Sequence, residues 1–427
     1  MKDKKILMIL NEFPPTGQSG VQRGLKFLKY TCRAGWEAHV ITPKNPVRKV
    51  VDYSLLSDIP SEAHIHRVTG FGINTVTESK MVHARFQEAA PQRQPEKLFW
   101  AFVKLINDLL FPYDKQIGWM PFALVKAIKL INKHKIRNVY ITAFPYSVFW
   151  VGLALKLIYG NRIFWVADYR DAWQFAPLLD KYVLPFRLKI ITKTDDLVLK
   201  RCDVALFVTE NIQERYIQKH PWLKHKSATI TNGYDEDDFV KLHSTFPKPK
   251  QFDCFTFMYM GKIHVSYGNP LPLLNAISQC NLPKFQFIHI GSVDQTVQDS
   301  ISKAGIDWYK FEGYKPHLEA LNYSSGADIN IIMLSDDPES EHSYTGKLFE
   351  LLRLGKPILA VGPKNSIIKQ VLDQTQGGKY AHISDIDQIV SCINELLTLP
   401  QNRLIPLQIL HQYSREHLTK SLLDLYN

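Results

Sequence analysis

Gly346, Lys347 and Glu350 combine residue types that suit a phosphorylated ligand within one short stretch of the chain. If a helix begins at Gly346, its first N–H groups and the Lys347 ammonium match the charge of a diphosphate. Glu350 lies about one turn further on among apolar residues, and a carboxylate in such surroundings needs hydrogen-bond donors, which ribose hydroxyls would supply. Alternatively, Glu350 pairs with Arg353 or a lysine and is structural.

These residues belong to a segment, residues 343–359 (SYTGKLFELLRLGKPIL), that predicts a loop, a helix and a strand in turn. Ser343 or Thr345 can cap the helix, Gly355 can end it, and Pro357 opens the strand. Thr345 therefore joins Gly346 and Lys347 as a candidate ligand-binding residue at the helix start.

Gly17 and Gly20 lie in a second candidate loop, NEFPPTGQSG (residues 11–20), between a predicted strand and a predicted helix. Glycines at such a turn let the backbone approach a phosphate or a sugar, and the helix start favours negative charge. A tight turn without a ligand explains them equally well, because the G-x-G-x-x-G pattern is absent.

Asp168, Arg170 and Asp171 follow another buried strand, so we expect their polar groups at the carboxyl edge of a sheet, where open α/β folds bind ligands. We take them as candidate catalytic residues. Alternatively, Arg170 and Asp171 form an ion pair that holds the loop and Trp173.

Short apolar runs alternate along the chain with longer amphipathic stretches, which is typical of parallel sheets covered by helices on both faces. We predict strands at residues 6–10, 38–42, 139–142, 163–167, 204–208, 256–260, 285–290, 329–333 and 357–361. Residues 232–253, with an Asn-Gly turn and two prolines, read as a connector between two such series. A helix over about residues 404–426 ends the chain.

Composition excludes several classes of protein. The hydrophobic share of 45% can fill two cores, and the basic residues behind the net charge of +11 are scattered, which argues against nucleic acid as a partner. The five cysteines are far apart, odd in number and never paired as C-x-x-C, so we expect a reduced, cytoplasmic protein. No stretch is long and apolar enough to span a bilayer.

Two further features leave alternatives open. Asp235-Glu236-Asp237 and Asp385-Ile386-Asp387 match a metal-binding D-x-D spacing. We interpret the first as acids of a hinge turn and the second as acids near a helix start, and we expect no metal at either. Residues 97–113 (KLFWAFVKLINDLLFPY) form an apolar stripe that either packs on the core or lies on a membrane surface.

Several motifs together resemble glycosyltransferase family 4, which has the GT-B fold. They are FPP with a nearby glycine after the first strand, NGYDEDDF at residues 232–239, and KLFELLRLGKPIL at residues 347–359. GWMP (118–121), ADYRDAW (167–173), and Cys202-Asp203 with Thr209-Glu210 resemble a bacterial subgroup that builds surface polysaccharides. The resemblance implies two Rossmann-like parallel-sheet domains facing a cleft, residues 1–243 and 244–407, with a terminal helix 408–427 packing back on the first.

The resemblance also assigns residues in the second domain. It implies that Glu350 binds the donor ribose and that Lys262, after a glycine at the first strand, clamps the diphosphate. Gly291 resembles the turn that closes the neighbouring strand, and the backbone at Tyr314 resembles the segment that reads the nucleobase. Asp168 resembles the first-domain residue near the reacting sugar carbon.

The sequence departs from the family pattern at two positions. The acid expected eight residues before Glu350 is replaced by His342, with Glu341 beside it. A second lysine expected six places after Lys262 is Gly268. The diphosphate is then left to Lys262 and Lys347.

The resemblance implies a retaining, metal-independent hexosyltransferase without a cofactor. Its partners would be a nucleotide-sugar donor and a glycan or lipid-linked acceptor, with peripheral contact to the inner face of the cell membrane. Two other functions fit the same residues: a nucleotide-sugar epimerase of the same fold, and a non-catalytic binding subunit of a polysaccharide-assembly complex.

Overall fold

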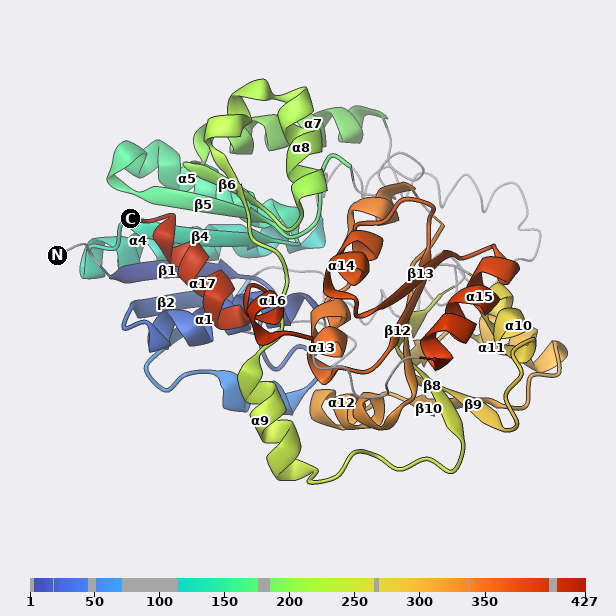
Figure 1. Cartoon of the computed structure of the whole chain (residues 1–427). Coiled ribbons are helices and arrows are strands. Elements are labelled where there is room, and N and C mark those ends of the chain that lie inside the picture. Colours follow the sequence, from blue (N-terminus) through green and yellow to red (C-terminus); the bar gives the residue numbers. More distant parts are fainter. Residues whose placement is uncertain are drawn as a thin grey trace, which may run out of the picture. The chain divides into compact units, whose positions relative to one another are not determined.

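The computed structural model describes residues 4–17, 19–44, 51–70, 114–175, 185–264, 269–336, 338–398 and 405–427. The chain divides into two compact units (Figure 1): Met1–Ile230 with Leu422–Asn427, and Thr231–Ser421. Residues 97–113, the apolar stripe, lie outside the described residues. Within the described part of the chain, no helix has the length and apolar character needed to cross a membrane.

The first unit is built on a seven-stranded sheet in the order β3-β2-β1-β4-β5-β6-β7. Every neighbouring pair is parallel. The strands are β1 (Lys5–Leu10), β2 (Glu37–Pro43), β3 (His64–Val68), β4 (Asn138–Ala143), β5 (Phe164–Tyr169), β6 (Val204–Phe207) and β7 (Ser227–Thr229). The helices are α1 (Ser19–Arg33), α4 (Met120–His134), α5 (Phe149–Tyr159), α7 (Pro185–Arg201) and α8 (Glu210–Lys219). Short 3-10 turns lie at Tyr53–Asp58, Lys115–Trp119, Tyr146–Val148, Gly160–Arg162 and Pro221–His225.

The second unit has a six-stranded parallel sheet in the order β10-β9-β8-β11-β12-β13. Its strands are β8 (Phe255–Ile263), β9 (Phe285–Val293), β10 (Tyr309–Gly313), β11 (Ile329–Met333), β12 (Ile358–Gly362) and β13 (Gly378–His382). Its helices are α9 (Glu236–Thr245), α10 (Leu271–Ser278), α11 (Gln295–Lys303), α12 (His317–Gly326), α13 (Lys347–Leu354), α14 (Ile367–Thr375), α15 (Ile386–Leu397) and α16 (Leu407–His411), with a 3-10 turn at Pro338–His342.

Alternation along the central strands gives the second unit a core on each face of its sheet. Met258 and Met260 enter one buried cluster, whereas Phe257 and Tyr259 of the same strand enter the other. Since successive side chains of a strand point to opposite faces, a strand with a nearly continuous apolar sequence must be covered on both sides. The predicted two-sheet α/β architecture is therefore confirmed.

The strands that the sequence does not predict are β3, β7, β10 and β13, and each lies at an edge of its sheet. Edge strands are less buried, so their sequences need not be apolar; β3 reads HIHRV and β10 reads YKFEG. Apolar runs identify only strands that are covered on both faces.

The single terminal helix predicted over residues 404–426 is wrong, because α16 ends at His411 and α17 (Arg415–Asp424) begins after a break. At the break, Tyr413 packs on Phe349 with ring centroids 4.7 Å apart, and its carbonyl accepts a hydrogen bond from the Tyr234 backbone at 3.0 Å. Gly233 permits this approach, since a Cβ there would lie 2.0 Å from the Tyr413 oxygen.

The last residues, Leu422–Asn427, belong to the first unit. The Tyr426 hydroxyl donates a hydrogen bond to the Val139 carbonyl at 3.1 Å, and its ring contacts Trp36 and Phe164.

Candidate functional site

Gly261 and Gly291 form the floor of the candidate site in the second unit. They face each other near the carboxyl ends of the parallel strands β8 and β9. Their φ angles are 151° and 139°, a backbone conformation that residues with a side chain rarely adopt. A Cβ on Gly291 would lie 2.0 Å from the Gly261 carbonyl oxygen. Both positions therefore require glycine, and the backbone there is open to a close approach by a ligand.

His289 fixes this floor from within the sheet. The side chain is fully buried, with Nε2 at 2.8 Å from the Gly261 carbonyl oxygen and Nδ1 at 2.6 Å from the Tyr309 hydroxyl. Burial lowers the pKa of His289 to about 4, so the ring is neutral near pH 7. A neutral ring donates from Nε2 to Gly261 and accepts the Tyr309 proton at Nδ1. His289 was not predicted from the sequence, although a lone histidine in the apolar strand FQFIHIGSV is a visible signal.

Lys347 is the cation that lies at the glycine floor. Its ammonium donates to the Met260 carbonyl and lies 5.2 Å from the centre of the Tyr259 ring. A Cβ on Gly261 would come within 2.2 Å of the Lys347 Nζ. Burial lowers the pKa of Lys347 to about 8, and Glu350 partly opposes that shift. This ammonium is therefore poorly solvated and would gain from a nearby anion.

Lys262, the residue predicted to clamp the diphosphate, has an exposed side chain near the end of β8. Its backbone carbonyl accepts a hydrogen bond from the Tyr259 hydroxyl at 3.1 Å. Lys262 thus borders the site through its backbone, whereas Lys347 from α13 reaches the space beside Gly261.

The start of α13 differs from the capping pattern that the sequence predicts. Gly346 is the N-cap residue, and it forms no side-chain capping hydrogen bond. The prediction that Ser343 or Thr345 caps this helix is therefore wrong, while the predicted helix end at Gly355 is confirmed by its φ of 71°. The Thr345 hydroxyl is buried and has no hydrogen-bond partner among the described residues. A buried hydroxyl in this state is a position where a ligand oxygen would be stabilised.

Glu350 is oriented by a histidine from the neighbouring helix. Its Oε1 lies 3.0 Å from Nε2 of His317, the first residue of α12, and its side chain is 17% exposed. Arg353 instead pairs with Glu236, with Nε 2.9 Å from Oε2. The alternative pairing of Glu350 with Arg353 is therefore wrong, and Glu350 keeps one surface toward solvent.

Gly313 and Tyr314 lie where β10 ends and the chain turns toward α12. Gly313 has a φ of 70° with open space around it, and the Tyr314 side chain is exposed. The second unit thus brings Gly291, Thr345, Gly346, Lys347 and Glu350 to the carboxyl end of its sheet, with Tyr314 at the edge strand.

Asp168 does not emerge at the sheet edge as expected, because it is fully buried at the end of β5. Arg23 binds both carboxylate oxygens, at 2.8 and 2.9 Å. The hydroxyls of Tyr140 and Thr142 donate to Oδ2 at 2.6 and 2.7 Å. Because its oxygens already accept four hydrogen bonds within the core, we leave Asp168 out of the proposed reacting groups.

Arg170 and Asp171 form the ion pair that the sequence left as an alternative, with Nε 3.2 Å from Oδ2. Arg170 also donates from Nη1 to the buried Glu12 at 2.7 Å. A Cβ on Gly20 would lie 1.7 Å from Glu12 Oε2, so that glycine leaves room for the ion pair. Asp171 remains exposed, and Gly17 is half-buried in the loop between β1 and α1.

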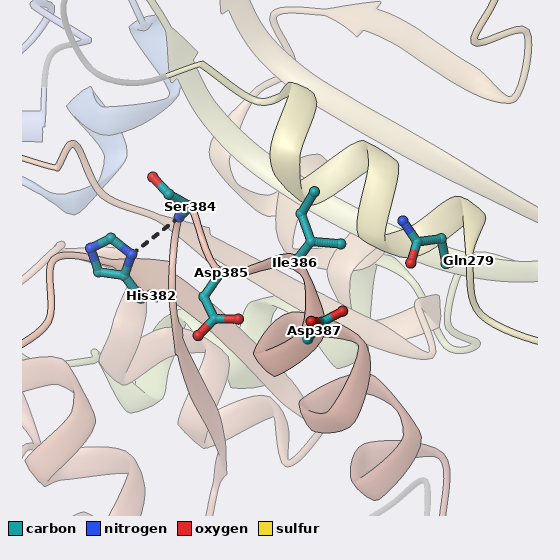
Figure 2. Close-up of a pocket in the computed structure, with 6 residues that line it drawn as sticks. All are labelled: Gln279, His382, Ser384, Asp385, Ile386 and Asp387. Carbon is teal, nitrogen blue, oxygen red and sulfur yellow. Dashed lines mark hydrogen bonds between the residues drawn. The ribbon is translucent and has the colours of Figure 1, made fainter.

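The first residue of each D-x-D pair caps a helix. This is the helix start predicted for Asp385, whereas Asp235 was expected in a turn of the connector 232–253, which instead contains α9. Asp385 accepts a hydrogen bond from the Gln388 backbone at 2.9 Å at the start of α15, and Asp235 accepts one from Asp237 at the start of α9. Figure 2 shows that Asp385 and Asp387 line a pocket together with His382 and Gln279. Neither Asp385 nor Asp387 belongs to a group of three metal-ligand atoms among the described residues.

No protein-family model and no curated protein sequence matches the chain. Solved structures do. The chain is similar to sucrose-phosphate synthase from Thermosynechococcus elongatus, with a TM-score of 0.65 and 15% identity over 99% of this chain and 98% of that one. It is similar to Anabaena HepE in complex with UDP-glucose (TM-score 0.61, 14% identity, 99% and 98% covered). A third is UDP-GlcNAc 2-epimerase from Neisseria meningitidis bound to UDP-GlcNAc (TM-score 0.55, 12% identity, 99% and 100% covered).

At these identities the similarity establishes the fold and no more. The similarity extends over 99% of this chain and so includes both parallel-sheet units. The chain therefore has the GT-B fold, with two Rossmann-like units.

Proposed function

We propose that the chain is a glycosyltransferase that takes a sugar from a nucleotide-sugar donor bound to the second unit. One observation carries the proposal: the poorly solvated Lys347 ammonium lies above two obligatory glycines, and Glu350 lies one turn along the same helix. Similar structures in complex with UDP, UDP-glucose and UDP-GlcNAc support a nucleotide-sugar ligand.

The diphosphate would lie between the start of α13, with the Gly346 backbone and the Thr345 hydroxyl, and the glycine floor, where the Lys347 ammonium lies. Glu350, held by His317, would accept hydrogen bonds from the ribose hydroxyls. The nucleobase would lie along the chain that follows Gly313, with Tyr314 beside it.

Transfer of the sugar leaves negative charge on the departing nucleoside diphosphate. Lys347 and the N–H groups at the start of α13 would stabilise that charge from fixed positions, which is where electrostatic catalysis is most effective. Lys262 would add a second positive charge at the end of β8. In the first unit, Arg170 and Asp171 are the polar groups that we assign to the acceptor side.

Further details follow from the motif resemblance to glycosyltransferase family 4. We propose hexosyl transfer with retention of configuration and without a metal. The acceptor would be a glycan or a lipid-linked glycan of a bacterial surface polysaccharide, reached at the cytoplasmic face of the membrane by peripheral contact.

A thermal-shift panel tests the donor site. Wild type is mixed with UDP, GDP, ADP and UDP-glucose; a ligand at 100 times its Kd stabilises the fold by about 2.7 kcal/mol. We expect Lys347→Met and Glu350→Ala to lose this shift. Lys262→Ala shows whether the exposed lysine contributes as well.

Two matched controls lie in the same unit. Lys303→Met removes an exposed lysine at the end of α11, and Glu395→Ala removes an exposed carboxylate that pairs with Lys379. Both should keep the full shift. If Lys347→Met and Glu350→Ala respond as the controls do, the donor site is elsewhere.

An epimerase is the second candidate, because the similarity to UDP-GlcNAc 2-epimerase covers all of that chain. An epimerase would interconvert the donor sugar without an acceptor and without releasing nucleoside diphosphate in proportion. A transferase would release nucleoside diphosphate in proportion to glycosylated acceptor. Quantifying UDP and the sugar products from one incubation separates the two.

A further inference from the structure

Four histidines and a glutamate gather at the amino ends of strands β2 and β3 in the first unit. Glu37 and His39 are two residues apart on β2 and therefore share a face of the sheet. His64 and His66 share a face of β3 in the same way, and His64 is the register partner of His39. His134, the last residue of α4, joins the same group.

Three of these side chains bring ligand atoms to one point. Glu37 Oε1 lies 2.8 Å from Nε2 of His39 and 3.4 Å from Nδ1 of His134. Together the ligand atoms of Glu37, His39 and His134 lie within 4.8 Å of one another. In a tetrahedral zinc site with bonds of about 2.0–2.1 Å, neighbouring ligand atoms are about 3.3 Å apart. Small side-chain shifts would therefore admit a metal ion.

The surrounding residues hold the ligands in place. His39 is almost fully buried, its Nδ1 lies 3.2 Å from Nε2 of His66, and the two rings stack with an interplanar angle of 3°. Metal-ligating histidines use the second ring nitrogen in this way. Lys5 Nζ lies 3.8 Å from Glu37 Oε2, whereas the contacts of Glu37 with His39 and His134 are made by Oε1.

The donor types of this group suit a transition metal. Neutral imidazole and carboxylate are the ligand types that Zn²⁺ and related first-row metals accept.

We propose that Glu37, His39 and His134 form a structural site for Zn²⁺ or a similar divalent transition metal, with water as the fourth ligand. The metal would take the place of the proton on His39 Nε2, and that ring would then carry its proton on Nδ1 and donate it to His66. Bound there, the ion would tie the end of α4 to the outer strands of the sheet. The site lies at the amino edge of the sheet, whereas Arg170 and Asp171 lie at the carboxyl edge, so its role is independent of the proposed sugar transfer.

Zinc titration by calorimetry tests this proposal on the full chain after EDTA treatment and removal of the chelator. We expect one Zn²⁺ per chain and a thermal unfolding temperature that rises with zinc concentration. His134→Ala and Glu37→Gln should each weaken binding about tenfold or more. Both side chains are partly exposed, so the variants should fold.

His64→Ala is the matched control, because His64 stacks on His39 but supplies no ligand atom to the site. It should bind zinc as wild type does, and Co²⁺ absorption should report the same coordination. The proposal fails if wild type binds no stoichiometric zinc. It also fails if His134→Ala and Glu37→Gln bind zinc as tightly as His64→Ala.

Discussion

Binding of a nucleoside diphosphate should be accompanied by proton uptake at Lys347. Burial lowers the pKa of this ammonium from its usual 10.5 to about 8, so at pH 8 about half of the free molecules carry the proton. A diphosphate beside it would stabilise the charged form and return the pKa toward its usual range. The expected uptake is therefore about 0.5 proton per ligand at pH 8 and about 0.1 at pH 7.

The same shift predicts how the ligand-free protein responds to pH. Between about pH 8 and 10.5 the folded chain has lost a proton that the unfolded chain still holds. The penalty for burying this charge, about 3 kcal/mol at neutral pH, should therefore be relieved as pH rises through that window.

Calorimetric titration with UDP, or with whichever diphosphate stabilises the fold, measures the uptake. The observed enthalpy is plotted against the ionisation enthalpy of several buffers at pH 8, and the slope gives the protons taken up. Lys347→Met should abolish the slope, and Lys303→Met should retain it. The phosphate itself contributes little, since its second pKa is about 6.

Two results would refute this reasoning. One is a wild-type slope near zero at pH 8 while UDP binds normally. The other is a slope in Lys347→Met that equals that of wild type, which would place the proton on another group.

Three further predictions concern stability, measured by urea unfolding. Asp195 accepts hydrogen bonds from two buried tyrosines, and burial raises its pKa to about 7. The folded state therefore keeps this proton to a higher pH than the unfolded state does, so the free energy of unfolding of wild type should fall from about pH 4 to 7. Asp195→Asn should flatten that decline. Gly291→Ala should lower the free energy of unfolding by about 2–4 kcal/mol, because the added Cβ would clash with the neighbouring strand. Gly305→Ala is the control: Gly305 has a φ of 68° but open space around it, so the loss should be only about 1 kcal/mol. Gly20→Ala should displace the flexible end of Arg170 from Glu12 and lower the free energy of unfolding by about 1–2 kcal/mol. An unchanged midpoint of urea unfolding would show that this ion pair does not contribute to stability.

The sequence by itself determined the central strands and the segment from Gly346 to Gly355. Strands covered on both faces must be apolar, and a helix that ends in a left-handed residue favours glycine there. Local residue types therefore predict both features. Glu350 could be proposed for the same reason, since a carboxylate among apolar residues requires a partner.

Only the tertiary structure decided which polar groups are available. Lys347 and Lys262 look alike in sequence, but one ammonium is turned into the space beside Gly261 and the other is exposed. The carboxylate of Asp168 is hydrogen-bonded to Arg23, a residue 145 positions earlier in the chain. Burial and pairing depend on contacts between distant segments, and these are absent from any local pattern of residues.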